Sequence, residues 1–190
     1  MREVLDRVGE TILAADEIAG VVRRLGEELT REYQGRTPVL VVPLEGSLIF
    51  LADLLRCLNL PVEFTTCQVA SYGSGCKPGS LRIIKGIDMP LAGRDVILVD
   101  DIYDSGRTLS FLYQLIADQR PGSLAVCVLL AKDRAREVEV PVDYIGVTIP
   151  DKFVVGYGMD YAQQLRHLPY IATFDCSREN IGAGLALPEG

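Results

Sequence analysis

Several short, mostly apolar runs, set apart by longer amphipathic segments, constrain the fold of this chain more than any other feature. They lie at Val39–Leu44, Asp95–Val99, Ser123–Leu130 and Tyr144–Ile149. Runs of this length that are rich in β-branched residues predict buried strands rather than helices. Buried strands that alternate with helices are typical of an α/β fold, so we expect a doubly wound, mainly parallel sheet flanked by helices.

Other segments supply the remaining predicted elements. Apolar residues spaced three and four apart predict one helix from Val8 to Glu32, which Gly35 ends. A glycine- and serine-rich stretch from Ala70 to Gly79 predicts a mobile loop at the tip of a hairpin. The other predicted elements are helices at Leu48–Leu58 and around Leu109–Ile116, and strands at Pro61–Val69, Leu81–Lys85 and Tyr170–Phe174.

Composition narrows the class of protein. The 190 residues, 48% of them hydrophobic, with no repeat and no long linker, predict a single domain over residues 1–190. A formal net charge of −7 argues against a nucleic-acid or membrane-surface partner, because both require clustered basic residues. Five cysteines without zinc-ligand spacing, and an N-terminus without an apolar signal core, predict reduced thiols and a cytoplasmic location.

The sharpest motif follows the predicted strand Asp95–Val99. That strand leads directly into Asp100 and Asp101, and open α/β sheets bind ligands at the carboxyl ends of their strands. The next residues, Asp104–Thr108, predict a tight turn into a helix whose free N–H groups favour a phosphate. Carboxylates can hold ribose hydroxyls or a hydrated cation while the turn holds a phosphate of the same molecule. The segment therefore predicts a site for a phosphorylated sugar.

A purely structural interpretation of this motif is weaker. Asp104 or Ser105 could serve as a helix N-cap, and Asp100 and Asp101 could merely end a strand. Capping does not explain two adjacent carboxylates after a buried strand, because their mutual repulsion needs a compensating partner. The glycine-rich dinucleotide fingerprint and the P-loop motif are absent, so a nucleotide would not be bound in either of those ways.

A second segment narrows the assignment to a family. The first motif resembles the phosphoribosyl-pyrophosphate motif of type I phosphoribosyltransferases. The run Ile149-Pro-Asp-Lys-Phe-Val-Val-Gly-Tyr-Gly-Met-Asp-Tyr161, followed by Arg166–Ile171, resembles the hypoxanthine-guanine branch of that family, especially its bacterial members. Leu44–Phe50 and Ser71–Gly73 are similar to that branch's pyrophosphate loop and mobile catalytic loop. The resemblance covers the chain from Val39 to Phe174 in the expected order.

This resemblance implies a fold, a reaction and its requirements. The fold would be that of type I phosphoribosyltransferases, with a small hood and a mobile active-site loop. A 6-oxopurine, hypoxanthine or guanine, would displace pyrophosphate from 5-phosphoribosyl pyrophosphate and give IMP or GMP, with Mg²⁺ required. The family also suggests a homodimer or homotetramer, with small molecules rather than nucleic acid or membrane as partners.

The family's residue roles are carried over to matching positions. Asp104 would act as general acid or base near N7 of the purine, Lys132 would donate to the 6-oxygen, and Phe153 would stack on the base. The implied contacts are Asp100 and Asp101 with the ribose; Ser105, Gly106, Arg107 and Thr108 with the 5-phosphate; Val154 and Asp160 on the purine side; Glu45, Gly46 and Arg166 with pyrophosphate; Ser71 and Tyr72 in the lid; and Asp100, Asp101 and Asp160 with the metal.

Two positions depart from the family pattern. Glu45 stands where the family usually carries lysine or arginine, and Asp100 replaces the more usual glutamate. If the Glu45 backbone alone binds pyrophosphate, the acidic side chain is tolerable; if the side chain counts, affinity should fall. Single residues also have plainer interpretations: Lys132 as a solvated charge at a strand end, Asp160 as a turn residue and Arg166 as a surface charge.

Three other functions share parts of these motifs. A regulator on the same fold would bind RNA through a basic face, which the net charge of −7 opposes. A phosphoacceptor domain normally carries its acidic pair after the first strand, whereas Asp100 and Asp101 lie past the middle of the chain. A pyrimidine or adenine transferase would share the phosphoribosyl motif alone. Side-chain identity does not rank hypoxanthine, guanine and xanthine.

Overall fold

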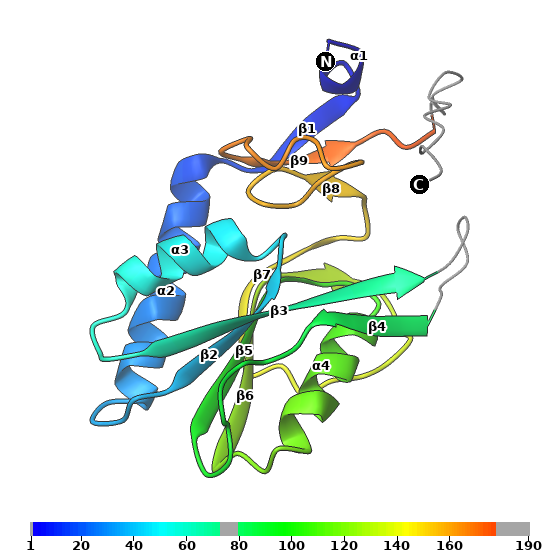
Figure 1. The fold of residues 1–190 in the computed structure, drawn as a ribbon. Helices are drawn as coiled ribbons and strands as arrows, with labels where there is room; N and C mark the ends of the chain where they lie inside the picture. Colours follow the sequence, from blue (N-terminus) through cyan, green and yellow to red (C-terminus); the bar gives the residue numbers. More distant parts are fainter. Residues whose placement is uncertain (1, 73–79, 178–190) are drawn as a thin grey trace.

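The computed structural model describes residues 2–72 and 80–177 and has two parts, a six-stranded sheet with helices on both faces and a smaller sheet at one end (Figure 1). The large sheet has the order β4-β3-β2-β5-β6-β7, with β3 and β4 antiparallel and all other neighbours parallel. Its strands are β2 (Val39–Leu44), β3 (Glu63–Tyr72), β4 (Ser80–Lys85), β5 (Asp95–Tyr103), β6 (Ser123–Asp133) and β7 (Tyr144–Pro150). The predicted doubly wound, mainly parallel sheet is confirmed.

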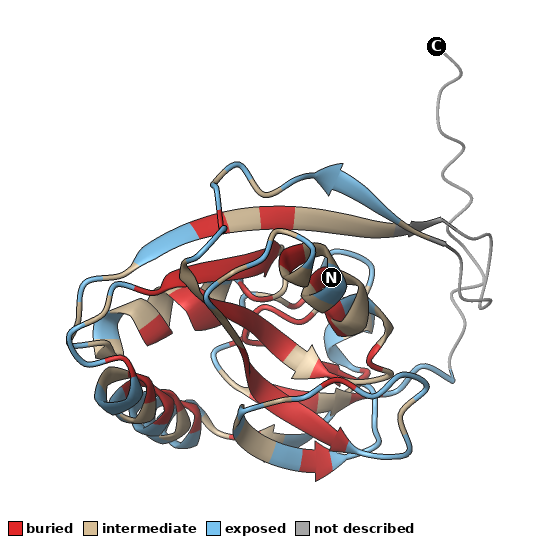
Figure 2. Cartoon of the chain, turned by 90° about the horizontal axis from the view of Figure 1, so that it is seen from below, coloured by how far each residue is buried: buried red, intermediate tan, exposed pale blue. Residues whose placement is uncertain are grey.

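Two apolar cores form because successive side chains of a strand point to opposite faces of the sheet. Leu40 and Val42 of β2 pack with α2 (Ala15–Glu32) and α3 (Leu48–Cys57), whereas Val39 and Val41 pack with α4 (Arg107–Ala117) on the other face. Figure 2 shows that the central strands are buried along most of their length. This burial gives the sheet a rigid edge on which to hold charged groups.

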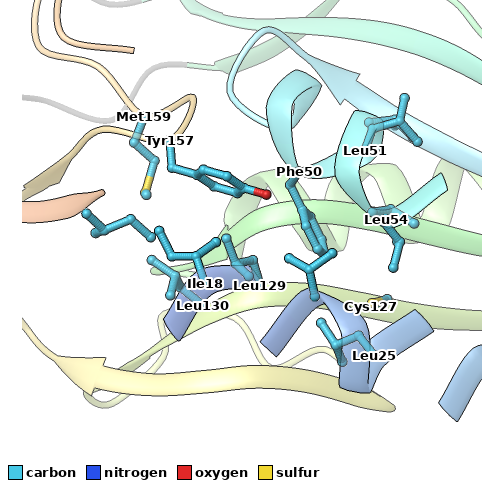
Figure 3. Packing of buried hydrophobic residues seen from close by; sticks show 14 of the residues in the cluster. Ile18, Leu25, Phe50, Leu51, Leu54, Cys127, Leu129, Leu130, Tyr157 and Met159 are labelled. Carbon is cyan, nitrogen blue, oxygen red and sulfur yellow. The ribbon is translucent and has the colours of Figure 1, made fainter. Parts of the chain in front are cut away.

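The smaller sheet, with the loop 156–170, is called the hood below. Its order is β1-β9-β8, all antiparallel, with β1 at Val8–Leu13, β8 at Val154–Val155 and β9 at Ile171–Phe174; the short α1 (Arg2–Leu5) precedes it. Tyr157 and Met159 reach from the hood into the core that residues of α2 and α3 also form (Figure 3). The Tyr157 hydroxyl donates to Asp53 Oδ2 at 2.7 Å. These contacts join the hood to the large sheet.

The predicted helix Val8–Glu32 is wrong over its first residues. Val8–Leu13 forms β1, and α2 begins at Ala15, where the Glu17 carboxylate accepts a hydrogen bond from the Ala14 backbone N–H at 2.8 Å. Strand β1 pairs with β9 at the other end of the described chain, with Val8 opposite Phe174. Apolar spacing alone does not reveal a partner that distant in sequence, and here the pairing overrides it.

Smaller differences concern the ends of strands. Strands β5 and β6 continue past their apolar runs to Tyr103 and Asp133, because they stay paired through their polar residues. Ala70–Tyr72, predicted as loop, belong to β3, which pairs with β4 as the arms of a hairpin. The rest of the predicted loop lies outside the described residues. Strand β8 was not predicted. Among the described helices none is both long and apolar enough to cross a lipid bilayer.

Candidate active site

A cavity of about 400 Å³ lies where the carboxyl ends of β2, β5 and β6 meet the hood. It brings together two sequence segments that both carry predicted site residues, one following β5 and the other around β8. The predicted residues among its lining are Gly46, Asp100, Asp101, Asp104, Ser105, Gly106, Thr108, Lys132, Phe153, Val154, Asp160 and Arg166.

Other predicted residues lie outside the described lining. The Glu45 carboxylate reaches the rim of the cavity, where Oε2 lies 3.5 Å from Arg166 Nη2. The Arg107 guanidinium lies 3.6 Å from Glu137 Oε2 instead. Ser71 and Tyr72 are the last residues of β3, and their side chains are outside the description.

Two adjacent buried carboxylates form the floor of the cavity. Asp100 and Asp101 are 7% and 9% exposed. Burial first, and then the charge of Asp101, raises the pKa of Asp100 well above its usual range; burial also raises the pKa of Asp101. A cation or hydroxyl donor in the cavity would relieve this unfavourable pair of charges.

Ser47, which was not predicted as a site residue, links the two carboxylates to α3. Its hydroxyl donates to Asp100 Oδ1 at 2.7 Å and accepts from the Asp101 backbone N–H at 3.2 Å. Beside it, a Cβ on Gly46 would lie 2.2 Å from Asp101 Oδ2, so this position has no room for a side chain. The Gly-Ser pair before α3 was the available signal: Leu44–Phe50 was matched to the family's pyrophosphate loop, but only Glu45 and Gly46 were given a role in it.

The turn into α4 borders the cavity, and one of its N–H groups is engaged by a long hydrogen bond, from the Arg107 backbone N–H to Ser105 Oγ at 3.4 Å. Gly106 occupies the N-cap with φ +87, a left-handed conformation that favours glycine, and it brings no side-chain acceptor. A Cβ there would lie 2.0 Å from the Val138 carbonyl oxygen. Thr108 and Leu109, in the first turn of α4, line the cavity. A helix N-terminus in this position suits a phosphate.

Another part of the lining combines a buried cation with an aromatic surface. Lys132 is 8% exposed, and its Nζ lies 2.6 Å from Asp104 Oδ2. The Phe153 ring is 44% exposed and packs edge-on against Tyr161, with centroids 6.2 Å apart. Val154 is buried in β8 opposite Thr173. A flat ring with a polar edge would fit between these groups.

Arg166 stands at the remaining side of the cavity between two carboxylates. Its Nη2 lies 2.9 Å from Asp160 Oδ1 and 3.5 Å from Glu45 Oε2, while Nη1 donates to the Gly158 carbonyl at 2.7 Å. The Leu44–Glu45 peptide bond, which precedes Gly46, is cis. Arg166 thus places a cation within 4 Å of the Glu45 carboxylate.

The acidic side chains of the cavity fit a divalent cation in part. Within the described residues, no three Asp, Glu, His or Cys side chains form a ready metal cage. Mg²⁺ commonly binds through one or two carboxylates together with waters and substrate phosphates, and the buried Asp100–Asp101 pair fits that pattern. Asp160 fits less well, because Oδ1 pairs with Arg166 and Oδ2 accepts from the Gln163 backbone N–H at 2.8 Å.

Comparison with known proteins identifies the family. A family model described as a phosphoribosyl transferase domain matches residues 8–162. Hypoxanthine phosphoribosyltransferase from Escherichia coli K12 is 46% identical over 165 residues, which cover 85% of this chain and 93% of that protein. A bifunctional TilS/HprT protein from Listeria monocytogenes (strain F2365) is 43% identical over 86% of this chain, but the chain spans only about a quarter (26%) of that protein's length.

Solved structures agree with this assignment. The crystal structure of a hypoxanthine phosphoribosyltransferase from Staphylococcus aureus superposes with a TM-score of 0.85 at 34% identity, covering 90% of this chain and 94% of that one. The family match, the identities and the shared fold thus point the same way. The chain belongs to the phosphoribosyltransferase family and, within it, to the hypoxanthine and hypoxanthine-guanine phosphoribosyltransferases.

Proposed function

We propose that this chain transfers the 5-phosphoribosyl group of phosphoribosyl pyrophosphate to hypoxanthine or guanine, and that it thereby serves purine salvage. One observation carries the proposal. A single cavity is lined both by the carboxylate and turn segment after β5 and by Lys132 and Phe153. A sugar phosphate and a flat base can therefore occupy one site and react with each other.

The phosphoribosyl half uses the segment after β5. Asp100 and Asp101 accept hydrogen bonds from the ribose hydroxyls, and residues 105–108 surround the 5-phosphate at the N-terminus of α4. Gly106 supports this role because its left-handed conformation forms the turn into α4 and its missing side chain leaves room for the Val138 backbone beside that turn. Arg107 contributes its backbone N–H, since its guanidinium lies near Glu137.

The base half uses Lys132, Asp104 and the hood. Lys132 donates to the 6-oxygen, and Asp104 exchanges a proton with N7 of the purine. The 2.6 Å distance between Lys132 Nζ and Asp104 Oδ2 supports this pairing, because the 6-oxygen and N7 lie side by side on one purine edge. Phe153 stacks on the base, and the backbone of Val154 reads its far edge.

The pyrophosphate half uses Arg166 and the loop at Glu45–Gly46. Negative charge grows on pyrophosphate as its bond to C1 breaks, so a fixed cation beside it stabilises the transition state. Arg166 is the group on this chain for that task, with the Gly46 backbone as a further donor. We propose Mg²⁺ as cofactor, held by Asp100 and Asp101 with a secondary contribution from Asp160. When bound, Mg²⁺ would offset the charge of the departing pyrophosphate.

Water must be excluded, because the ribose cation that develops at C1 would also react with it. We propose that Ser71 and Tyr72 belong to a lid that closes over the site. The support is their place at the end of β3, in a hairpin whose neighbouring residue Val69 lines the cavity.

Three further predictions concern the whole protein. We propose a homodimer or homotetramer, supported by large apolar side chains that this chain leaves exposed on α3, β3 and β4, namely Leu48, Phe64 and Ile84. A cytoplasmic location is supported by the free thiols of the described cysteines. We also keep residues 1–190 as a single domain.

The test is an assay of the purified chain with phosphoribosyl pyrophosphate, Mg²⁺ and one nucleobase at a time. Hypoxanthine and guanine should give IMP and GMP with release of pyrophosphate. Adenine should react slower by on the order of 10⁴-fold, because an ammonium can donate to a 6-oxygen but is left unpaired against a 6-amino group. Comparable turnover of adenine would refute the role of Lys132, and no product with any 6-oxopurine would refute the proposed function.

A further inference from the structure

Four charged side chains alternate in sign at the carboxyl ends of β5, β6 and β7. The register brings them together, because Tyr103 of β5 lies opposite Ala131 and Asp133 of β6 lies opposite Pro150. The residues that follow these pairs are therefore neighbours. The four are Asp104, Lys132, Arg134 and Asp151.

The distances describe a closed ring of ion pairs. Lys132 Nζ lies 2.6 Å from Asp104 Oδ2, and Arg134 Nη1 lies 3.2 Å from Asp104 Oδ1. Asp151 Oδ1 lies 3.8 Å from Lys132 Nζ and 3.6 Å from Arg134 Nη1. Each oxygen of the Asp104 carboxylate thus has its own cation, and Asp151 stands between the two cations.

The two cations differ in their access to the substrate. Lys132 lines the cavity, whereas Arg134 lies outside its described lining and pairs with Asp104 Oδ1. A 6-oxopurine that accepts a hydrogen bond from Lys132 competes with Asp104 for that ammonium. Asp104 then depends on Arg134 to keep its orientation while it exchanges a proton with the base.

The backbone of Asp104 is held separately from its carboxylate. Arg136 Nη1 donates to the Asp104 carbonyl at 3.1 Å, and the Arg136 guanidinium lies 4.2 Å from the centroid of the Tyr103 ring. Removal of Arg134 would therefore release Asp104 Oδ1 and leave the turn before α4 in place.

We propose that Arg134, backed by Asp151, is a positioning residue that holds Asp104 Oδ1 and leaves Oδ2 turned toward the purine edge. This inference rests on the proposed function, because it takes Asp104 as the group that exchanges a proton with the base. Arg134 itself touches no substrate and acts through Asp104.

The experiment compares kcat and KM of the full chain carrying Arg134→Gln, Arg134→Lys or the control Arg94→Gln. Arg94 pairs with Glu63 at 2.7 Å, and its side chain is 32% exposed against 34% for Arg134, but it lies at the start of β5, away from the cavity. Arg134→Gln should lower kcat with hypoxanthine about tenfold, because a misdirected carboxylate is a poor proton acceptor. KM for phosphoribosyl pyrophosphate should stay within twofold. Arg134→Lys, which keeps the charge, should recover most of the loss.

A double-mutant cycle with Asp104→Asn separates positioning from general damage to the site. If Arg134 acts through Asp104, adding Arg134→Gln to Asp104→Asn should change kcat less than twofold. The same tenfold loss in both backgrounds would overturn the inference, and so would an Arg134→Gln variant as active as Arg94→Gln. A wild-type chain inactive with every 6-oxopurine would instead overturn the proposed function, before any variant is compared.

Discussion

At the carboxyl edge of the large sheet, the proposed phosphoribosyl contacts come from one continuous segment, Asp100–Thr108, whereas the hood is assembled from both ends of the described chain. In the hood, Arg7 lies against a pair of aromatic rings whose centroids are 4.4 Å apart, at 4.7 Å from the centroid of Tyr161 and 4.6 Å from that of Phe174. Its Nε donates to the Asp175 carbonyl at 2.9 Å. The charged groups at the edge are carried by a buried sheet. The aromatic surface of the hood is instead held by contacts between residues that are far apart in the sequence.

This difference suggests a division of labour between chemistry and base binding. Phe153 packs against Tyr161 and Phe174, with centroids 6.2 Å and 6.1 Å away, so the two rings that Arg7 contacts also support the proposed stacking surface. Variants at the sheet edge should therefore change kcat, and variants in the hood should change KM for the base. The predictions below test that division.

The largest expected effect is at Asp104. Asp104→Asn keeps the shape of the side chain and removes its basic function, so kcat should fall by about 10²–10⁴-fold, the usual range for a lost general acid or base. Binding of phosphoribosyl pyrophosphate should be nearly unchanged. Steady-state kinetics test this, with Asp118→Asn at the end of α4 as a control that should keep full activity. Near-normal turnover of Asp104→Asn would remove Asp104 from the mechanism.

The sharpest test of the hood is Arg7→Met, which keeps an unbranched stem and removes the charge. Loss of the cation–π contacts should loosen the rings behind Phe153 and raise KM for hypoxanthine about tenfold, with KM for phosphoribosyl pyrophosphate within twofold. The matched control is Arg36→Met, because Arg36 also stacks on a ring, 4.5 Å from the Tyr33 centroid, away from the cavity. A fall in kcat at constant KM would contradict the division of labour.

How far the sequence predicts each region follows from the same contrast. Apolar runs revealed β2, β5, β6 and β7, and with them the edge where Asp100, Asp101 and Lys132 lie. The hood was mispredicted as helix at β1, because its pairing with β9 depends on residues at the far end of the chain. Ser47 and Arg134 were not singled out, since the partner of each lies in a segment distant in sequence. Ser47 bonds to Asp100, and Arg134 pairs with Asp104. Local patterns report local structure, and contacts between strands need the fold.

A third prediction concerns the stability cost of the buried carboxylates at the sheet edge. Because burial and Asp101 raise the pKa of Asp100, the folded state binds a proton at Asp100 more readily than the unfolded state does. The free energy of unfolding therefore gains from Asp100 as pH falls through the raised pKa toward the ordinary value, and it loses above the raised pKa, where the Asp100 carboxylate is ionised. Asp100→Asn removes this cost and keeps an acceptor for the Ser47 hydroxyl.

In metal-free buffer at pH 8, Asp100→Asn should raise the free energy of unfolding by about 1 kcal/mol and Tm by roughly 2–4 °C. The advantage should shrink as the pH is lowered through the raised pKa of Asp100, because the wild-type carboxyl then takes up its proton. Thermal denaturation over this range measures it. An advantage that grows on acidification would contradict the prediction, and so would a variant less stable at pH 8.

The smallest expected effect lies where the two regions meet, at Glu45. Its Oε2 lies 3.5 Å from Arg166 Nη2, so the Glu45 carboxylate competes with pyrophosphate for the Arg166 guanidinium. It also adds a negative charge beside a polyanion. Such a charge costs on the order of 1 kcal/mol at 4 Å even in water. Glu45→Lys should lower KM for phosphoribosyl pyrophosphate about fivefold and tighten inhibition by pyrophosphate. The gain should shrink at high salt, because salt screens exposed charges.

Glu63→Lys makes the same change in net charge beside Arg94, away from the cavity, and should leave both constants unchanged. If Glu45→Lys also changes neither constant at low ionic strength, the loop would contribute through its backbone alone, and Arg166 would bind pyrophosphate without interference from Glu45.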